Sequence, residues 1–501
     1  MRRRALEYFL IALTSVLYLV AAVSRSRRPF WYDELFTLYV SQLDGMSTVW
    51  AALKDGADLN PPLFYITTRF FTSLAGANEL SLRLPAILGY LVLCLSLRTF
   101  TARKLGFAWG LAAMWIPMIC GSMFYATEAR AYGQVLGFTG LAAVAWQGLQ
   151  ASSRRTQNLL CLAACLAGAL LTHCYAVLIL APFGLAEAAR SWQHRRIDWP
   201  AAAAVCLPGL VALSYLPLMG AISPVAVDNE VFRPTWMSIP MFFTFMLWPV
   251  ILPILAASMA VPIHGLSRPS RPAKGNGFAL SESILALGFL LVPLLAMLLA
   301  ALVTRIYMPR YGLAAILGLT IFLCSLLWRM GERRTAAGYT AAAVFAISFL
   351  LIPGRWPHNQ TREQDLFAQA MKLETTQPEL PIVVSSGLLF LEIDHYAPPP
   401  LASRLHFIGD AALARKWTGT DMFDKSFPGL RRWFPLRASL EAPDSFLPSH
   451  TRFLVYGMVG HPMDWLVDEL RVRRWNLKTL DQNADRILYL AEPPGALAEK
   501  P

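Results

Sequence analysis

Long apolar runs dominate the first 353 residues of this 501-residue chain. From Ala5 to Pro353 the runs are about 16–25 residues long, and a helix of about 20 apolar residues spans the hydrocarbon core of a bilayer. Hydrophobic residues make up 56% of the chain and charged residues only 15%, whereas soluble domains hold roughly 25% charged residues. The chain is therefore predicted to be a mainly α-helical, polytopic membrane protein.

The polar connections between the runs predict the number of spans and their direction. Basic residues recur in every second connection, 17 on one side against 10 on the other, and the positive-inside rule makes the richer side cytoplasmic. The N-terminus is then inside, and an odd number of spans exports the C-terminal residues. We predict eleven spans, at 5–24, 80–99, 106–123, 133–150, 158–172, 174–189, 199–220, 237–263, 282–303, 311–328 and 336–353.

The first span has a second interpretation. Met1-Arg2-Arg3-Arg4 before an apolar run is also typical of a signal peptide. The run of about 20 residues is longer than the usual h-region of roughly 7–15, which favours an uncleaved anchor. The anchor leaves residues 25–79 as a long first extracytoplasmic loop.

The net charge of +12 follows from this topology. Residues 1–354 carry 27 basic and 14 acidic side chains, while residues 355–501 carry 17 and 18. The excess of positive charge therefore belongs to the membrane part and not to a polyanion site. No GxxxxGK[ST] or GxGxxG motif is present, so neither nucleic acid nor a nucleotide is an expected partner.

Residues 354–501 have the composition of a soluble domain, and the chain divides into a membrane domain, 1–353, and this extracytoplasmic domain. Short apolar strands alternate with helical stretches such as 461–470, which predicts a small α/β sandwich. Glu392 and His395 lie three residues apart on an expected helix. They are half of a metal site or a surface-exposed pair, and the lack of further ligands favours the surface pair. The strands are expected at 381–385, 404–408, 453–456 and 486–490.

Ionisable residues avoid the middle of the spans and gather in the outer loops. Ion-coupled transporters usually carry such residues in mid-membrane, whereas here the first outer loop holds Asp33 and Glu34 and a later one holds Glu128 and Arg130. Acids and bases at an extracytoplasmic membrane face indicate chemistry on a lipid headgroup.

Six short motifs occur in order on this predicted outer side. They are Trp31-Tyr32-Asp33-Glu34, Asp58–Tyr65 (DLNPPLFY), Glu79–Pro85 (ELSLRLP), Glu128–Tyr132 (EARAY), Thr172-His173 and Arg310-Tyr311. The series resembles the ArnT/protein O-mannosyltransferase superfamily of family 39-like glycosyltransferases with the GT-C fold, over about residues 5–330.

The resemblance implies an activity and a location. A sugar would pass from a polyprenyl-phosphate donor to an acceptor, with inversion and without a nucleotide or cofactor. The acceptor would be a lipid, glycan or protein of the envelope. The reaction would take place among membrane lipids at the outer face of a bacterial cytoplasmic membrane. The C-terminal domain varies among relatives and says little.

The acceptor hydroxyl must lose its proton to a base as the new bond forms. Asp33 and Glu34 are adjacent, so their side chains project at least about 100° apart and only one can face the substrate. The resemblance assigns the base to Asp33 and leaves Glu34 to order the loop or to bind the acceptor. Both could instead be interfacial acids or helix N-caps.

The departing phosphate needs positive charge, which a bidentate Arg supplies without a metal. Arg130 is the first candidate and Arg310 the second. Glu128 is a poor partner for Arg130, because residues two apart do not share a helix face. Arg83 lies four residues after Glu79 at a helix start, where a structural salt bridge competes with a donor contact.

The remaining motif residues have less specific roles. His173 is either a polar helix cap or a headgroup contact. Tyr132 would stack on the sugar or belong to an interfacial aromatic belt, and Tyr311 is assigned to donor binding by the resemblance alone. Some relatives place a Lys before the Pro-Pro pair, where this chain has Asn60, so the Arg residues must carry more of the phosphate charge.

Three alternatives remain at this stage. Asp228-Asn229-Glu230 could provide a divalent metal site, although no partner acid is evident. A lipid or solute transporter or flippase would be expected to carry charges within its spans and to have both termini inside. A scaffold that binds through its C-terminal domain would make the motifs accidental.

Overall fold

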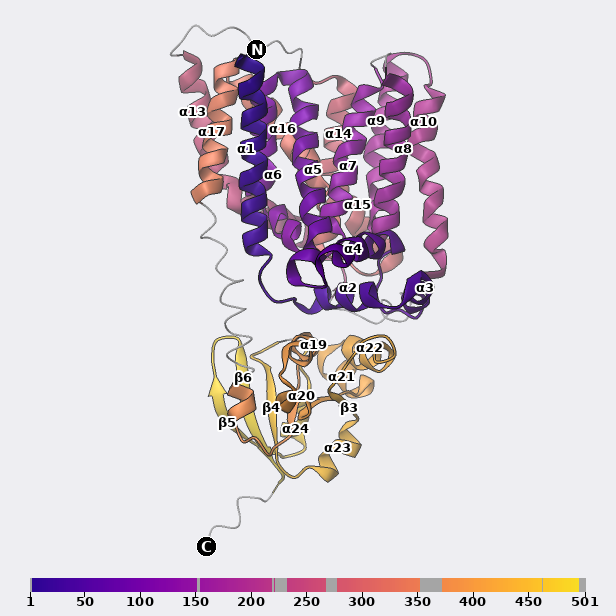
Figure 1. Cartoon of the computed structure of the whole chain (residues 1–501), viewed down its shortest axis with the longest axis vertical. Coiled ribbons are helices and arrows are strands. Elements are labelled where there is room, and N and C mark those ends of the chain that lie inside the picture. The colour runs from indigo at the N-terminus through magenta and orange to yellow at the C-terminus, as the bar shows by residue number, and fades with distance from the viewer. Residues whose placement is uncertain are drawn as a thin grey trace. The chain divides into compact units, whose positions relative to one another are not determined.

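The chain folds into two compact units, each built from separate stretches of sequence (Figure 1). A computed structural model describes residues 2–150, 154–218, 220, 232–266, 277–351, 372–461 and 463–494. The first unit comprises Met1–Arg27, Leu59–Met219 and Pro234–Pro357, and the second comprises Arg28–Asp58, Gly220–Arg233 and His358–Pro501. Residues 28–58 of the predicted first loop thus belong with the C-terminal residues. The predicted domain boundary at 353/354 lies outside the described residues and stays a prediction.

The first unit is a bundle of apolar helices. Its α-helices are α1 (Arg2–Arg25), α4 (Pro62–Ala75), α5 (Glu79–Leu105), α6 (Phe107–Ile119), α7 (Tyr132–Gly148), α8 (Arg155–Thr172), α9 (Leu180–Gln193), α10 (Trp199–Cys206), α12 (Ser238–Leu247), α13 (Ile251–Leu266), α14 (Leu280–Leu290), α15 (Val292–Leu299), α16 (Ala315–Met330) and α17 (Thr335–Leu351). Shorter helical turns are η1 (Gly121–Thr127), η3 (Cys174–Ile179), η4 (Leu207–Tyr215), η6 (Trp248–Val250), η7 (Ala300–Thr304) and η8 (Pro309–Gly312).

Each predicted span overlaps a helical segment, but the count of eleven spans is not confirmed. Among the described residues, six helices are long and apolar enough to cross a membrane, or up to eight if two bent pairs each count as one span. Phe107–Ile119 and Gly121–Thr127 meet at 73°, and Leu280–Leu290 and Val292–Thr304 meet at 46°. The apolar run 106–123 therefore contains a sharp turn that hydropathy alone does not register.

Glycine allows two helices of this bundle to approach closely. A Cβ atom on Gly133 of α7 would lie 2.3 Å from the carbonyl oxygen of Ala86 on α5, and one on Gly89 would lie 2.5 Å from the carbonyl oxygen of Gly133. Small residues permit such backbone contact in membrane helices. The start of α7, which follows the Glu128–Tyr132 motif, is thereby fixed against α5.

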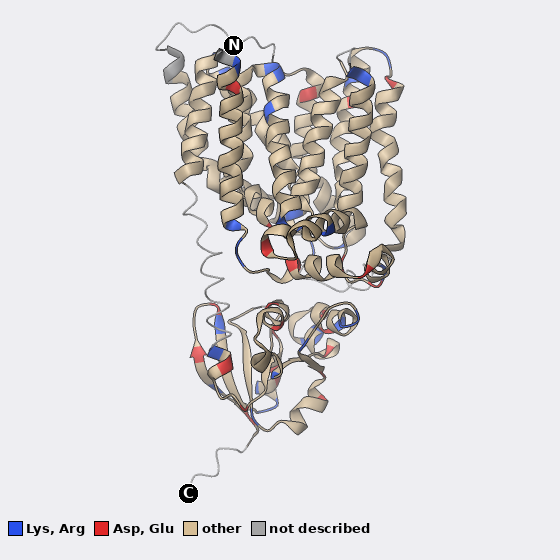
Figure 2. Cartoon of the chain, in the orientation of Figure 1, with Lys and Arg blue, Asp and Glu red and all other residues tan. Residues whose placement is uncertain are grey.

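Charged residues of the helical unit lie near the helix ends and leave the middle of the bundle almost uncharged (Figure 2). Two buried carboxylates near these ends are paired. Glu187 lies 2.7 Å from the Arg190 guanidinium, and Glu282 lies 3.1 Å from the Lys104 ammonium. Pairing reduces the cost of burying these charges, and their position agrees with the expected scarcity of charge in mid-span.

The second unit contains a six-stranded mixed sheet with the order β3-β2-β1-β4-β6-β5. β1 pairs in parallel with β2 and β4, and β2 in parallel with β3, while β6 runs antiparallel to both β4 and β5. Val383, Val455 and Tyr489 are adjacent across three strands and lie in one buried core. The strands are β1 (Ile382–Val384), β2 (Leu405–Ile408), β3 (Ser439–Glu441), β4 (Phe453–Met458), β5 (Asn476–Gln482) and β6 (Arg486–Glu492).

The predicted α/β domain and its four strands are confirmed, and two strands were missed. β3 has only three residues, and β5 is an edge strand that carries Lys478 and Asp481 and is partly exposed. Neither has the buried apolar pattern that predicts a strand. The helices of this unit are α2 (Tyr32–Gln42), α3 (Gly45–Lys54), α19 (Gly387–Tyr396), α20 (Pro399–Ala402), α21 (Ala411–Thr418), α22 (Met422–Leu430), α23 (Pro443–Ser449) and α24 (Leu466–Val472).

Candidate active site

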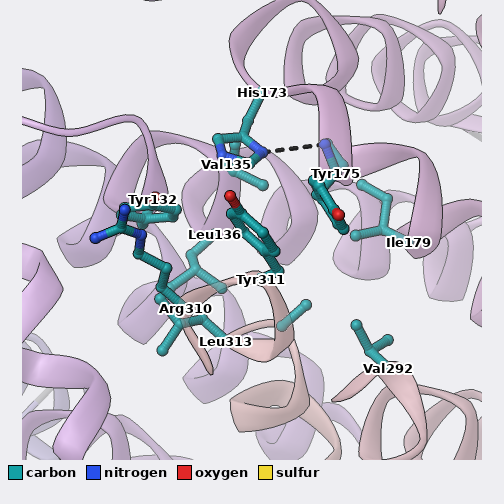
Figure 3. Close-up of a pocket in the computed structure, with 12 residues that line it drawn as sticks. Tyr132, Val135, Leu136, His173, Tyr175, Ile179, Val292, Arg310, Tyr311 and Leu313 are labelled. Atoms are coloured by element: carbon teal, nitrogen blue, oxygen red, sulfur yellow. Dashed lines mark hydrogen bonds between the residues drawn. The ribbon is translucent and has the colours of Figure 1, made fainter. Parts of the chain in front are cut away.

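Four aromatic side chains from three separate stretches of the helical unit form one cluster (Figure 3). The His173 ring centroid lies 5.3 Å from that of Tyr132 and 5.6 Å from that of Tyr311. Tyr175 stacks on Tyr311 with the ring centroids 3.8 Å apart. The start of α7, the end of α8 and the η8 turn therefore meet here, and three of the four residues were predicted from the motifs.

Arg310 belongs to the same cluster. Its guanidinium carbon lies 5.8 Å from the centroid of the Tyr132 ring, within the range of a cation–π contact. Beside it is a small cavity of about 30 Å³, space for about two water molecules. The cavity is lined by Tyr132, Val135, Leu136, His173, Tyr175, Ala176, Ile179, Val292, Arg310, Tyr311, Leu313 and Ala314. The arrangement places a cation and aromatic rings at the edge of an apolar cavity.

His173 ends α8 and caps the next turn. Its Nδ1 atom accepts a hydrogen bond of 3.1 Å from the backbone N–H of Tyr175. A neutral imidazole that accepts at Nδ1 carries its proton at Nε2 and donates from there. The polar cap predicted for His173 is thus present at Nδ1, and the headgroup contact stays a prediction.

Tyr175 is the residue that the motifs missed. Its hydroxyl donates to the Ile306 carbonyl at 2.8 Å and hydrogen-bonds the Thr304 hydroxyl at 2.5 Å. These bonds tie the η3 turn to the segment before η8, which carries Arg310. Its position two residues after His173 was the only available signal.

Asn60, Glu128 and Arg130 are buried in the same unit. Asn60 is 3% exposed and precedes Pro61, the N-cap residue of α4, and Pro62, its first residue. Its neighbour Leu59 accepts a hydrogen bond from the Cys174 thiol, next to the aromatic cluster. Glu128 and Arg130 are 0% and 8% exposed, and they lie in the bend between η1 and α7, two to four residues before Tyr132.

Arg83 has a structural contact. Its side chain is fully buried, and its Nη1 atom donates to the Ser26 carbonyl at 2.7 Å, just beyond the C-terminal end of α1. A cation at the carbonyl end of a helix is stabilising. The contact links α5 to the end of the first helix. The salt bridge to Glu79 and the donor contact that were predicted for Arg83 both stay predictions.

Asp33 and Glu34 lie in the first turn of α2, in the second unit. Glu34 is fully buried, accepts a hydrogen bond of 3.3 Å from the Trp31 N–H, and lies 3.9 Å from the Arg28 guanidinium. Asp33 is half-buried. Glu34 thus orders the loop as an N-terminal cap, and Asp33 is the more accessible of the two carboxylates.

The α19 helix holds this segment. Glu392 is 2% exposed, and its Oε1 atom accepts a hydrogen bond of 3.1 Å from the Tyr32 N–H. His395 Nδ1 lies 2.8 Å from the Tyr39 hydroxyl oxygen. The expectation of a surface-exposed Glu392–His395 pair is therefore wrong, because α2 covers the face of α19 that carries both side chains.

Burial and nearby carboxylates raise the pKa of two tyrosines in this segment. Burial, followed by the charges of Asp33 and Asp58, raises the pKa of Tyr32 well above its ordinary value. Burial, followed by the Asp394 charge, also raises the pKa of Tyr39. Both tyrosines remain neutral at physiological pH and act only as hydrogen-bonding and packing groups.

No group of three or more His, Cys, Asp or Glu side chains that could hold a metal ion occurs within the described ranges. Asp228 and Glu230, the metal ligands considered from the sequence, lie outside those ranges.

Comparison with solved structures identifies the fold. ArnT from Cupriavidus metallidurans in the apo state is similar to this chain with a TM-score of 0.55 and 13% identity, over 98% of both chains. The same protein bound to undecaprenyl phosphate gives a TM-score of 0.54 and 14% identity, over 99% of both chains. This chain has an ArnT-like GT-C fold.

The ArnT-like fold extends through the C-terminal unit, well beyond the 5–330 range suggested by the motifs. An oligosaccharyltransferase from Archaeoglobus fulgidus has a TM-score of 0.44, with 10% identity over 90% of this chain and 68% of the other; that likeness is too low to bear on the site. No protein-family model and no curated protein sequence matches the chain.

Proposed function

We propose that the protein is an integral-membrane, inverting glycosyltransferase that moves a sugar from a polyprenyl-phosphate donor to an envelope acceptor. The observation that carries the proposal is the cluster of Tyr132, His173, Arg310 and Tyr311 beside an apolar cavity, within an ArnT-like fold. One of the similar ArnT structures contains undecaprenyl phosphate. The transfer would take place at the outer face of a bacterial cytoplasmic membrane, with the N-terminus of the protein inside and its C-terminal domain outside.

The donor would bind in the helical unit. Arg310 and Arg130 would bind the phosphate and stabilise its charge as the bond to the sugar breaks. Tyr132 and Tyr311 offer aromatic faces to the sugar, and His173 and Asn60 offer hydrogen-bonding groups. These assignments require no divalent metal.

Asp33 would be the base that acts on the acceptor. The hydroxyl oxygen of the acceptor attacks the anomeric carbon, the bond from that carbon to the phosphate oxygen breaks, and the polyprenyl phosphate leaves. Asp33 takes the hydroxyl proton as the bond forms. A single displacement of this kind inverts the anomeric configuration. Glu34, which is buried as a cap, orders the loop and does not meet the acceptor.

Replacement of Asp33 tests the proposal. Asp33→Asn keeps the size of the side chain but removes its basicity, so single-turnover transfer from a saturating polyprenyl-phosphate sugar should fall by about 10²–10⁴-fold. Asp44→Asn is the matched control, because Asp44 is an exposed acid of the same segment that makes no capping hydrogen bond. Its rate should remain that of the wild type.

Two further measurements distinguish lipid-linked donors from sugar nucleotides and metal-independent from metal-dependent transfer. Sugar nucleotides should not serve as donors, and EDTA should leave the rate nearly unchanged. Wild-type transfer by Asp33→Asn with normal melting would show that the base is elsewhere. Loss of activity on chelation, restored by Mg²⁺ or Mn²⁺, would favour a route through the Asp228–Glu230 segment.

A further inference from the structure

The second unit joins two stretches that are about 360 residues apart in sequence, and helix α19 makes three polar contacts between them. Three side chains of α19 face residues 30–39. Glu392 accepts from the Tyr32 N–H at 3.1 Å, and the Tyr396 hydroxyl accepts from the Phe30 N–H at 2.7 Å. His395 meets the Tyr39 hydroxyl at 2.8 Å. The contacts flank Asp33 on both sides.

Glu392 binds the first turn of α2, the turn that contains Asp33. The first N–H groups of a helix have no partner within the helix, and the Tyr32 N–H is one of them. A carboxylate at a helix N-terminus makes a charge-assisted hydrogen bond and interacts favourably with the helix dipole. Glu34 accepts a hydrogen bond from the Trp31 N–H in the same way. Two buried carboxylates, from distant parts of the chain, thus fix the turn that contains Asp33.

Aromatic packing from the C-terminal residues fixes the rotation of α2 about its axis. The Tyr32 ring lies 5.5 Å from that of Phe423, and the rings of Phe36 and Tyr39 lie 5.1 and 5.0 Å from that of Phe434. Residues 32, 36 and 39 share one face of a helix. Since this face is held, the direction in which Asp33 projects is determined by the C-terminal domain.

We propose that Glu392 is a positioning residue for the transfer reaction, through which the C-terminal domain holds Asp33 at the angle that catalysis needs. The inference rests on the proposed function of Asp33 as the base. It gives the C-terminal α/β domain a role in the chemistry itself, whatever acceptor the enzyme uses. Glu392 acts through the Tyr32 amide and does not touch the substrate.

Two variants at this position separate positioning from charge. Glu392→Ala removes the acceptor of the Tyr32 N–H, and kcat should fall about 10- to 100-fold, the scale of effect that misplacing a reacting group by about 1 Å can have. The donor KM should change less than about twofold, because the donor residues proposed above belong to the other unit. Glu392→Gln keeps an acceptor oxygen and should restore most of kcat.

Glu469→Ala is the matched control. Glu469 is also a buried glutamate of this domain, 6% exposed, and it binds the Trp417 indole and Arg473 instead of residues 28–58. Its loss should lower the melting temperature of the full-length protein in detergent and leave kcat unchanged. A drop in kcat equal to that of Glu392→Ala would show that general loosening of the domain is enough, and would overturn the proposal.

Amide hydrogen exchange of the full-length protein provides a readout that does not depend on activity. Peptides covering residues 30–42 should exchange at least about tenfold faster in Glu392→Ala than in the wild type, with Glu392→Gln close to the wild type. Unchanged exchange and unchanged kcat in Glu392→Ala would refute the positioning role. If the wild type transfers no sugar while exchange responds as expected, the proposed reaction is wrong and the contact itself stands.

Discussion

A buried acid of the C-terminal domain makes the stability of that domain depend on pH. The Ser385 hydroxyl donates to Asp464 Oδ2 at 2.8 Å, while Oδ1 is buried and has no hydrogen-bond partner among the residues that the structure describes. Burial raises the pKa of Asp464 from 3.8 to about 6, and the nearby charge of Asp468 adds to the effect. The folded state therefore binds this proton more tightly than the unfolded state does.

The sign and the size of the effect follow from that difference. A folded-state pKa above the unfolded value means that stability is lost as the pH rises from about 4 to about 6. One pKa unit corresponds to about 1.36 kcal/mol, so ionisation of Asp464 costs at most ~3 kcal/mol at pH 8. Asp464→Asn removes this cost but buries an amide donor, which costs about 1 kcal/mol or more. We expect a net gain of about 1–2 kcal/mol at pH 8.

Thermal melting of the full-length protein in detergent, followed from pH 4 to pH 8, measures the effect. The transition of the C-terminal domain in Asp464→Asn should lie about 2–8 °C above that of the wild type at pH 8, and the gap should close or reverse below about pH 5. Asp444→Asn, at a side chain that is 88% exposed, should give a gap near zero throughout. A difference between Asp464→Asn and the wild type that stays constant across the range would refute the reasoning, because it would show that Asp464 does not titrate on folding.

Two further predictions concern the helical unit. Arg310→Ala should slow transfer, and Arg310→Lys should restore only part of the rate, because an ammonium cannot reproduce a bidentate contact with phosphate; single-turnover assays measure both. Gly121→Ala should fold poorly, because its Cβ atom would lie 2.2 Å from the Phe245 carbonyl oxygen, whereas Gly184→Ala, with nothing within 4 Å of the added atom, should match the wild type in yield and melting temperature.

The sequence by itself determined the class of protein and the order of its parts. Long apolar runs predict membrane helices because the bilayer selects for length and hydropathy, which are local properties. The four apolar strands of the C-terminal domain were found for the same reason. Motif order brought Tyr132, His173 and Arg310 into one hypothesis before any contact between them was known.

Only the tertiary structure decided which surfaces meet. Glu392 and His395 lie on one face of a helix by spacing, but spacing cannot say that α2 covers that face. Tyr175 carried no distinctive pattern, and its role emerged from stacking on Tyr311, a residue 136 positions away in the numbering of the chain. The turn at Cys120 was hidden because hydropathy averages over a run and does not register backbone direction. Contacts between distant residues depend on how whole helices and strands pack, and that packing fixes which carboxylate is buried as a cap and which remains accessible.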